Sequence, residues 1–381
     1  MNDVSVLSPK ATPTAAVASA AATTLSIIDC DFHPFVPLTE VIARMPEKTR
    51  KYVQVSGYAA VLGREHNRFL IPTGEPLRLD AVPARGGLAG SDPAFAVADY
   101  LDRWGIAAAV MMPIQAMGVI AWAAEEVVNS YLQGINDLFL EMWHAEDPRY
   151  KVLISVSPHD PDAAIREIER LADQPGVVGF QIPMGEIGLG SSAMFKLYDV
   201  ASHYGLPLVL HPNSVDCSLQ NSPSCAGRVT RSYAEHHLLL AQPGQGAATQ
   251  LVLSGALARF PKMRVVLSEF GFSWVGPMMW RMDTAWKRGG GSDSLLPRPP
   301  SEYMLEQMRF TTQPYDEPEN PRDLRPMLDA MQAERTLVFS SDYPHWDTDH
   351  PDVVLRRLPI EIRQRVSMQT ALETFGSRLG L

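Results

Sequence analysis

Side chains that can bind a metal ion follow four apolar, strand-like runs of this sequence. In chain order they are Asp31 with His33, His211, Glu269 and Asp342. Asp31 and His33 are two positions apart, so on a strand their side chains share one face and can meet at one ion. Imidazole nitrogen and carboxylate oxygen suit a hard or borderline divalent ion, and a coordination position left open for water is typical of a catalytic site.

The chemistry of such a site is activation of water or of an acidic substrate. Asp31, His33, His211 and Asp342 are predicted to hold one divalent ion. A water on the ion becomes acidic near neutral pH, and Asp342 can take its proton. Glu269 is predicted to orient the substrate or to carry a proton, although an ion pair with Arg281 is the competing interpretation.

These side chains need a scaffold that brings strand ends together. Apolar runs of strand length alternate with helical patterns about eight times, which is typical of βα units and a parallel sheet. Polar residues at the carboxyl ends of several strands favour a closed (β/α)8 TIM barrel over a doubly wound sheet. The predicted strands are 25–30, 107–112, 151–156, 177–182, 206–211, 264–269, 308–312 and 336–341.

Further segments complete the predicted organisation. Residues 1–24 are small and polar and are expected to form a disordered tail, and 25–381 a single barrel domain. Residues 34–92 follow the first strand as a long insertion, placed over the barrel mouth, with a short hairpin around 58–70. A helical stretch over 231–260 is expected to break at Pro243-Gly244, and C-terminal helices from 352 onward cap the barrel.

Composition excludes several classes of partner. The chain has 381 residues and a formal net charge of −10, which disfavours nucleic acid and anionic membranes. No apolar run approaches the roughly 18 residues that span a bilayer. Three cysteines and no convincing signal peptide indicate a reducing compartment, and the expected location is the cytoplasm.

The motifs together resemble the amidohydrolase-2 branch of the amidohydrolase superfamily, which includes enzymes like aminocarboxymuconate-semialdehyde decarboxylase. The resemblance rests on the segments 29–34, 254–261, 269–274 and 341–346, and on His211 after Leu-Val-Leu. It implies a (β/α)8 barrel and one divalent ion, zinc by preference and manganese as the alternative, with Asp31, His33, His211 and Asp342 at the ligand positions. The bridging lysine of binuclear relatives is absent, which implies a mononuclear site.

Two positions depart from that family pattern. Asp31 stands where many relatives have His and some decarboxylases have Glu. Glu269 stands on the sixth strand, where decarboxylase-like relatives carry a catalytic His in a His-x-Gly pattern. A carboxylate cannot polarise a carbonyl as an imidazolium does, so the sequence favours hydrolysis over decarboxylation.

Three functions are therefore weighed from the sequence. The preferred one is a mononuclear metal-dependent hydrolase that directs water at a carbonyl-like carbon of a small organic substrate. The alternative is a non-oxidative decarboxylase of an aromatic or unsaturated acid, and a non-catalytic small-molecule-binding barrel is the third. The substrate is expected to contact His345, Trp274, Trp346 and Arg281, and the resemblance is compatible with a homodimer.

Overall fold

The structure is a computed structural model that describes residues 26–55, 77–121, 124–185, 187–212 and 233–381. The predicted N-terminal tail, the hairpin around 58–70, and Cys217 and Cys225 lie outside these residues. Among the described helices, none combines the length and the apolar composition that a bilayer-spanning helix requires.

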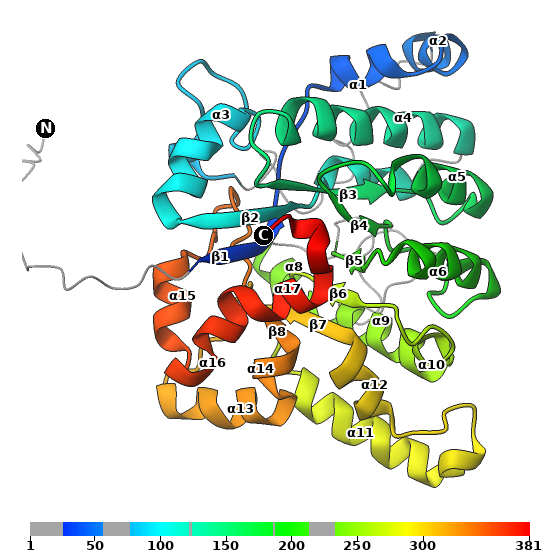
Figure 1. Cartoon of the computed structure of the whole chain (residues 1–381), viewed down its shortest axis with the longest axis vertical. Coiled ribbons are helices and arrows are strands. Elements are labelled where there is room, and N and C mark those ends of the chain that lie inside the picture. The colour runs from blue at the N-terminus through cyan, green and yellow to red at the C-terminus, as the bar shows by residue number, and fades with distance from the viewer. Residues whose placement is uncertain (1–25, 56–76, 122–123, 186, 213–232) are drawn as a thin grey trace, which may run out of the picture.

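Eight parallel strands form one sheet in sequence order, β1 to β8, and helices surround it (Figure 1). The strands are β1 (Ile27–Phe32), β2 (Ile106–Met111), β3 (Tyr150–Ser155), β4 (Val177–Gln181), β5 (Leu208–Leu210), β6 (Val265–Leu267), β7 (Met308–Thr311) and β8 (Leu337–Val338). The helices are α1 (Leu38–Arg44), α2 (Glu47–Val55), α3 (Pro93–Ala96), α4 (Glu125–Leu138), α5 (Pro161–Leu171), α6 (Ser192–Tyr204), α8 (Tyr233–Leu238), α9 (Ala241–Leu253), α10 (Ala256–Arg259), α11 (Val275–Arg288), α12 (Pro300–Gln307), α13 (Leu324–Met331), α14 (Ala333–Thr336), α15 (Pro351–Arg357), α16 (Ile360–Gln364) and α17 (Thr370–Phe375).

The sheet closes where the segment after β8 meets β1. The amide of Cys30 donates to the carbonyl of Phe339 at 2.9 Å, and the amide of His33 donates to that of Tyr343 at 2.8 Å. The amide of Asp342 donates to the carbonyl of Asp31 at 3.0 Å. The (β/α)8 barrel predicted from the sequence is therefore confirmed, and its closing seam joins two of the predicted ligands.

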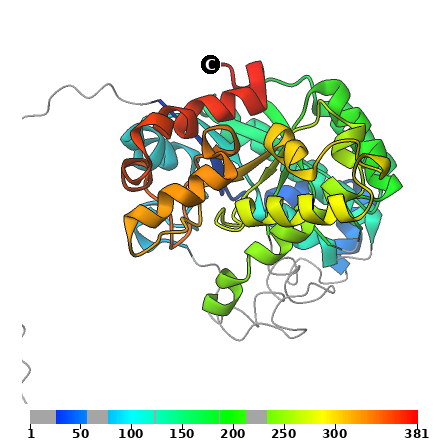
Figure 2. The same cartoon turned by 90° about the horizontal axis from the view of Figure 1, so that it is seen from below.

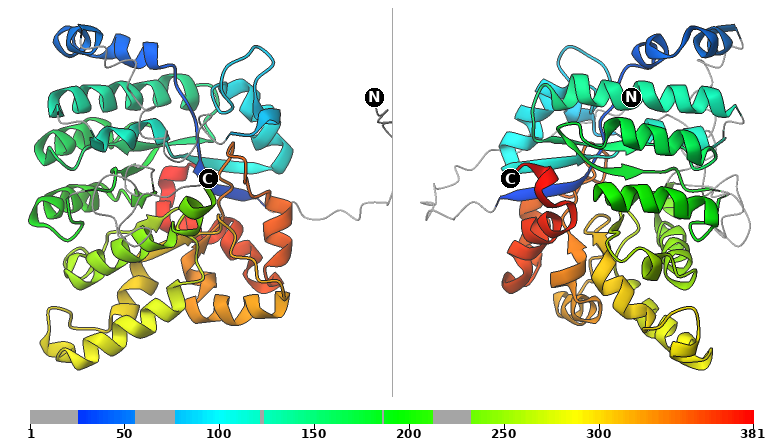
Figure 3. Two further views of the ribbon diagram at one scale, coloured as in Figure 1. Left: turned by 180° about the vertical axis from the view of Figure 1, so that it is seen from behind. Right: turned by 45° about the vertical axis from the view of Figure 1, so that its right-hand side comes forward.

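Two apolar clusters make the core. The inner one fills the barrel with apolar side chains from every strand except β7, such as Cys30, Val209, Val266 and Val338, and Phe375 of α17 joins it. The outer cluster packs strands against helices, and α4, α5 and α6 lie side by side on that surface (Figures 1 and 3). Continuous apolar strands are thus explained by burial on both faces.

The C-terminal helices and α8 lie on opposite sides of the barrel (Figure 2). The C-terminal segment, coloured red, covers the end at which the strands begin, because α17 packs into the inner cluster there. The site residues follow the carboxyl ends of the strands, at the other end. This arrangement leaves the site-bearing end to the loops and to α8.

Part of the long segment after β1 reaches that end of the barrel. Leu77 forms an antiparallel bridge with His345, and the amide of Arg78 donates to the carbonyl of Pro344 at 2.9 Å. The amide of Phe35 donates to the carbonyl of Gly90 at 2.7 Å. The insertion therefore contacts the loop that carries the last predicted ligand.

The helical stretch before β6 breaks at a different place from the prediction. α8 ends at Leu238 and α9 begins at Ala241, so Pro243 and Gly244 lie inside α9. Pro243 occupies the first turn of α9, where its missing N–H costs no intrahelical hydrogen bond. The expectation of a break at Pro243-Gly244 was wrong for that reason.

Gly244 allows α9 to approach the residue after Glu269. A Cβ built on Gly244 would lie 2.6 Å from Cβ of Phe270, whereas one built on Gly246 meets nothing within 4 Å. Gly244→Ala is expected to lower the free energy of unfolding by about 1–3 kcal/mol. Gly246→Ala, on the same helix, should leave it unchanged or raise it by up to about 1 kcal/mol. Urea denaturation of the two variants checks this, and equal stabilities would contradict the close approach.

Candidate metal centre

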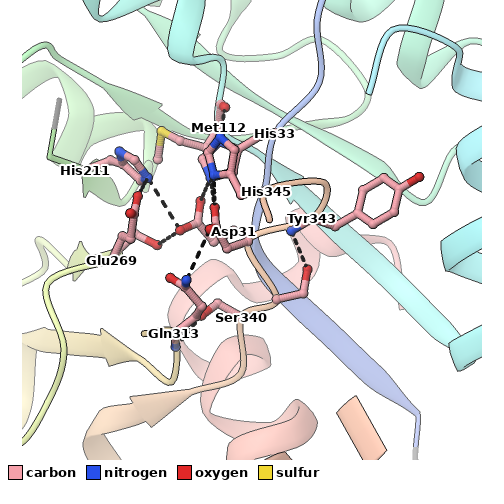
Figure 4. Close-up of polar contacts among 12 residues, drawn as sticks. Asp31, His33, Met112, His211, Glu269, Gln313, Ser340, Tyr343 and His345 are labelled. Atoms are coloured by element: carbon pink, nitrogen blue, oxygen red, sulfur yellow. Dashed lines mark hydrogen bonds and ion pairs between the residues drawn. The ribbon is translucent and has the colours of Figure 1, made fainter. Parts of the chain in front are cut away.

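Six buried side chains from four strand ends converge in the barrel (Figure 4). Ligand-type atoms of one set all lie within 4.8 Å of one another, and this set consists of Asp31, His33, His211 and Glu269. A second set under the same limit consists of His33, Asp342 and His345. His33 belongs to both, so the two sets form one continuous cluster of imidazoles and carboxylates.

A bulge in β1 turns its two ligands into the barrel. Asp29 pairs with Ala109 and Phe32 with Met111, so three residue steps in β1 correspond to two in β2. Cys30 packs in the inner cluster and Phe32 in the outer one. The extra residue lets Asp31 face inward directly after Cys30, as bulges beside active sites commonly re-aim a side chain.

Backbone carbonyls fix which nitrogen each imidazole offers. Nδ1 of His33 lies 2.9 Å from the carbonyl oxygen of Met112, and Nδ1 of His211 lies 2.5 Å from that of Pro212. A carbonyl can only accept, so both Nδ1 atoms carry hydrogen and both Nε2 atoms are the free nitrogens. This is the arrangement by which a metal-binding histidine is held in one tautomer.

The free nitrogens point at carboxylate oxygens. Nε2 of His33 lies 2.7 Å from Oδ1 of Asp342 and 3.3 Å from Oδ1 of Asp31. Nε2 of His211 lies 2.5 Å from Oε2 of Glu269 and 3.7 Å from Oδ2 of Asp31. In neutral rings these nitrogens are acceptors facing acceptors, which is repulsive unless a proton or a cation lies between them.

Three buried ligand atoms make no hydrogen bond within the part of the chain that the structure describes. They are Oδ1 of Asp31 and Nε2 of both His33 and His211. Buried polar atoms are normally satisfied, so three orphans in one cluster indicate a missing partner. A divalent cation fits, because it would satisfy all three and would offset the carboxylate charge.

The charges of the cluster shift the pKa values of its members. Burial opposes protonation of His33, but the carboxylates around it, above all Asp31, raise its pKa to about 10. Burial raises the pKa of Asp31. For Asp342 burial acts in the same direction, yet the positive charge of His345 and the close approach of His33 outweigh it, so its pKa lies below the usual range. A proton on His33 thus takes the place that a metal ion would fill.

Two site carboxylates lie on strained backbone. Glu269 and Asp342 both have φ of +62°, and Gln332 is the one other non-glycine residue with positive φ among those described. Non-glycine residues rarely adopt this conformation, and where they do the surroundings impose it, often at active sites. Here the amide of Glu269 donates to Oγ1 of Thr311 at 3.0 Å, and Asp342 is tied to Asp31 through the closing seam.

His345 lies beside Asp342 in the structure, and its contact with substrate stays a prediction. Its Nδ1 lies 2.5 Å from Oδ1 of Asp342, and its ring stacks on His33 with centroids 4.5 Å apart. Burial opposes protonation of His345, but the charge of Asp342 raises its pKa above the usual value. The pair Asp342–His345 can therefore hold a proton beside the ligand cluster.

A polar chain that the sequence did not reveal continues from Asp342 to the rim. Nε2 of Gln313, two residues after β7, donates to Oδ2 of Asp342 at 3.1 Å and to Oδ2 of Asp347 at 3.2 Å. Asp347 in turn pairs with Nε2 of His237 on α8 at 2.9 Å. An amide is not a usual metal ligand and His237 lies far away in sequence, so only the position of Gln313 after a strand could have signalled it.

The other residues expected to bind substrate lie in different environments. Trp274 is buried in the outer cluster, packs edge-on against Phe310, and donates to the carbonyl of Phe270 at 2.9 Å. Arg281 is exposed on α11, and Glu269 pairs with His211 instead of with Arg281. Trp346 follows His345 and is 56% exposed. No contact joins Trp274 or Arg281 to the cluster among the described residues, and substrate binding by Trp274, Trp346 and Arg281 stays a prediction.

Asp29 holds the two strand ends that carry Asp31 and Asp342. Its carboxylate accepts from the amide of Asp31 at 3.1 Å, from Tyr100 Oη at 2.7 Å, and from both the amide (3.0 Å) and Oγ (2.5 Å) of Ser341. Burial raises the pKa of Asp29 to about 7 in spite of these hydrogen bonds. The residue is fully buried and its bonds go to the backbone and to neighbours of the ligands, so it acts as a positioning residue.

Asp29→Asn is expected to weaken metal binding by roughly 10–100-fold, because an NH2 group would replace an oxygen that accepts two hydrogen bonds and the two strand ends would shift. Tyr100→Phe removes one donor and keeps the carboxylate, so its effect should be smaller. Competition with a metal-indicator dye measures both dissociation constants. If Asp29→Asn binds metal as the unmodified protein does while Tyr100→Phe does not, the positioning role is wrong.

Comparison with known proteins identifies the family of this chain. The Amidohydrolase family model matches residues 28–376. A gamma-resorcylate decarboxylase from Polaromonas sp. (strain JS666 / ATCC BAA-500) is 26% identical over 275 residues, covering 66% of this chain and 76% of the relative.

Solved structures share the fold. An amidohydrolase from Mycobacterium avium subsp. paratuberculosis K-10 aligns with a TM-score of 0.72 at 17% identity, over 94% of this chain and 100% of that one. A dihydroxybenzoic acid decarboxylase from Polaromonas sp. JS666, solved with bound manganese and the inhibitor 2-nitroresorcinol, aligns with a TM-score of 0.63 at 18% identity, over 92% and 97% of the two chains. With a family model that spans almost the whole barrel and the strand-end cluster inside it, this chain belongs to the amidohydrolase family of enzymes.

Proposed function

We propose that this protein is a metal-dependent decarboxylase of a hydroxylated aromatic carboxylic acid. One divalent ion would be held by Asp31, His33, His211 and Asp342, and manganese is as suitable as zinc. The observation that carries the proposal is the set of three orphaned buried ligand atoms in a barrel whose matched relatives are decarboxylases. The manganese and the resorcinol-type inhibitor of the structural relative support the same chemistry.

This proposal reverses the preference for hydrolysis that Glu269 suggested in the sequence. Besides lacking the polarising effect of an imidazolium, a free carboxylate at this position would repel a carboxylate substrate. In the structure Oε2 of Glu269 lies 2.5 Å from Nε2 of His211, within the ligand cluster. Its charge is therefore directed at a histidine or an ion and is partly neutralised there, which weakens the argument against an acidic substrate.

The residues divide the work as follows. The ion, when bound, supplies positive charge that holds an anionic substrate. Asp342 and His345, which are hydrogen-bonded to each other, together hold the proton that Asp342 delivers to the ring carbon bearing the carboxyl group. The bond between that carbon and the carboxyl group then breaks, its electron pair returns to the ring, and carbon dioxide leaves. One proton enters and one carbon dioxide departs, so no oxidant or reductant is needed.

Gln313 and Asp347 keep this proton donor in place. Gln313 bonds Oδ2 of Asp342, while Oδ1 faces His33 and His345. The two oxygens of one carboxylate thus have separate partners, which fixes the plane of the group. A fixed carboxylate beside a proton-holding imidazole is a suitable general acid.

Hydrolysis remains a second candidate because of the charge of the cluster. Three carboxylates, Asp31, Glu269 and Asp342, would leave a divalent centre with one net negative charge. A further carboxylate about 4 Å away would be repelled by roughly 1–4 kcal/mol. A neutral substrate avoids this cost, and Glu269 could then accept the proton of an attacking water. A non-catalytic barrel is not proposed, because the ligand set is complete.

One experiment separates the two candidates. The manganese-loaded protein is incubated in water enriched in heavy oxygen with 2,6-dihydroxybenzoate, 5-carboxyvanillate, and neutral aryl amides and esters. Carbon dioxide released from a hydroxybenzoate, with no heavy oxygen in the aromatic product, is the expected result. Heavy oxygen in an acid released from an amide or ester, with the hydroxybenzoates untouched, would decide for hydrolysis.

A further inference from the structure

A second charged cavity lies at the opposite end of the barrel from the ligand cluster. Arg264 directly precedes β6, Arg309 is the second residue of β7, and Arg335 lies in α14 just before β8. These positions are at the amino ends of the strands, whereas the ligands follow the carboxyl ends. The C-terminal segment, red in Figure 2, covers the same end and contributes Arg365 and Glu373.

The cavity measures about 310 Å3, which is within the size range of small-molecule sites. Four arginines and two glutamates line it, together with Pro261 and Leu305: Arg264, Arg309, Arg335, Arg365, Glu306 and Glu373. The chain as a whole carries a net charge of −10, so this cavity is a local concentration of positive charge in an acidic protein.

Both glutamates already have bidentate partners. Glu373 accepts from Arg365 at 2.6 and 2.8 Å, and Glu306 accepts from Arg298, outside the cavity, at 2.8 and 2.9 Å. Each of these carboxylates is thus matched by one guanidinium. Three positive charges in the cavity remain to be balanced.

The other three arginines make no ion pair within the described residues. Arg264 donates to the carbonyls of Pro261 and Met263, and Arg335 donates to the side-chain oxygen of Gln332. Arg309 donates through Nη1 to the carbonyl of Met308 at 2.8 Å. Carbonyls satisfy hydrogen bonds but leave the positive charges uncompensated.

Arg309 is the strongest indication of a missing anion. It is 6% exposed, and its Nε has no hydrogen-bond partner among the described residues. Burial, helped by the neighbouring charge of Arg264, lowers the pKa of Arg309 to about 10. Arginine is seldom buried without a carboxylate or another anion beside it. A guanidinium in this position destabilises the folded protein unless an anion lies beside it.

We propose that this cavity is a binding site for a small, multiply charged oxyanion, either a phosphate group or a dicarboxylate. Guanidinium groups recognise both through paired N–H donors, and three unpaired ones match two or more negative charges. The site is separate from the metal centre, since the two lie at opposite ends of the strands. The cavity exceeds a single phosphate in volume, so the group belongs to a larger small molecule.

The test uses the full-length, metal-loaded protein and labelled inorganic phosphate in equilibrium dialysis at constant ionic strength set with chloride. Saturable binding is expected, with at least about tenfold weaker binding in Arg335→Gln and in Arg264→Gln. Arg335 is exposed and its side chain donates to Gln332, so its replacement should leave the fold intact. Arg166→Gln, an exposed arginine on α5, makes the same charge change elsewhere and should bind as the unmodified protein does.

Two further arms complete the design. Succinate competes for the site, and displacement of phosphate only by succinate, or only by phosphate monoesters, identifies the source of the oxyanion. His211→Ala removes a metal ligand, so phosphate held at the metal centre would be lost there and phosphate in the arginine cavity would stay. Equal phosphate and succinate binding by the unmodified protein and both arginine variants would overturn the proposal.

Discussion

Asp342→Asn is expected to lower kcat for decarboxylation by about 10²–10⁴-fold while the protein stays folded. Asn keeps the shape of the side chain and the hydrogen bond to Gln313 can re-form, but Asn cannot hold the transferable proton. The proton of His345 then has no carboxylate through which to reach the substrate carbon. Steady-state kinetics with the best substrate from the panel gives the ratio, and circular dichroism with metal analysis shows that fold and ion are kept.

The control for this variant is Asp80→Asn, which removes an exposed carboxylate that pairs with Arg78. It should retain the unmodified rate. If Asp342→Asn with metal bound also retained that rate, Asp342 would not be the proton donor. Glu269, as the other strained carboxylate of the cluster, would become the candidate.

His33→Ala and His211→Ala are expected to lose the divalent ion and with it all measurable turnover. Each substitution removes one of the orphaned Nε2 atoms. Removing only a hydrogen-bond partner of a ligand lowers metal affinity by roughly 10–100-fold, and removing the ligand itself should lower it further. Elemental analysis of the purified proteins measures the bound metal. His203→Ala, an exposed histidine on α6, controls for the loss of an imidazole.

The histidine variants also distinguish two causes of lost activity. If His33→Ala contained a full equivalent of metal and yet was inactive, His33 would act on the substrate and not on the ion. Metal content equal in the unmodified protein and both variants would place the ion elsewhere.

The strand ends could be predicted because their signal is local. An apolar run followed by a ligand-type residue marks both the strand and its exit, and this placed Asp31, His33, His211, Glu269 and Asp342 at one end of the barrel. The parallel sheet then brings them together without any information about individual contacts.

The geometry inside the cluster could not be predicted, because backbone groups decide it. The carbonyls of Met112 and Pro212 choose the free nitrogen of each imidazole, and any residue type would offer the same carbonyl. The bulge in β1 could not be predicted from the sequence either. A regular strand with Cys30 pointing inward would point Asp31 outward. The positive φ at Asp342 follows from contacts across the closing seam.

Long-range polar partners were missed for a different reason. Gln313 follows β7 and His237 lies on α8. Neither is recognisable as part of the site until the structure places Gln313 beside Asp342 and Asp347, and His237 beside Asp347. Trp274, which was predicted to contact the substrate, packs its ring against Phe310 in the outer cluster, and its contact with substrate stays a prediction. Neighbouring positions on such a loop point in different directions, so the sequence alone does not distinguish a residue that lines the site from one that packs in the core.

The most direct test of the account is a metal titration of the chelator-stripped protein with manganese, in which bound ion and carbon dioxide release from 2,6-dihydroxybenzoate, or from the best substrate of the panel, are followed together. The account predicts that both rise in parallel and stop at one ion per chain. Full decarboxylation in the stripped protein, or activity that appears only with the second ion, would contradict a single metal centre built from the four strand ends.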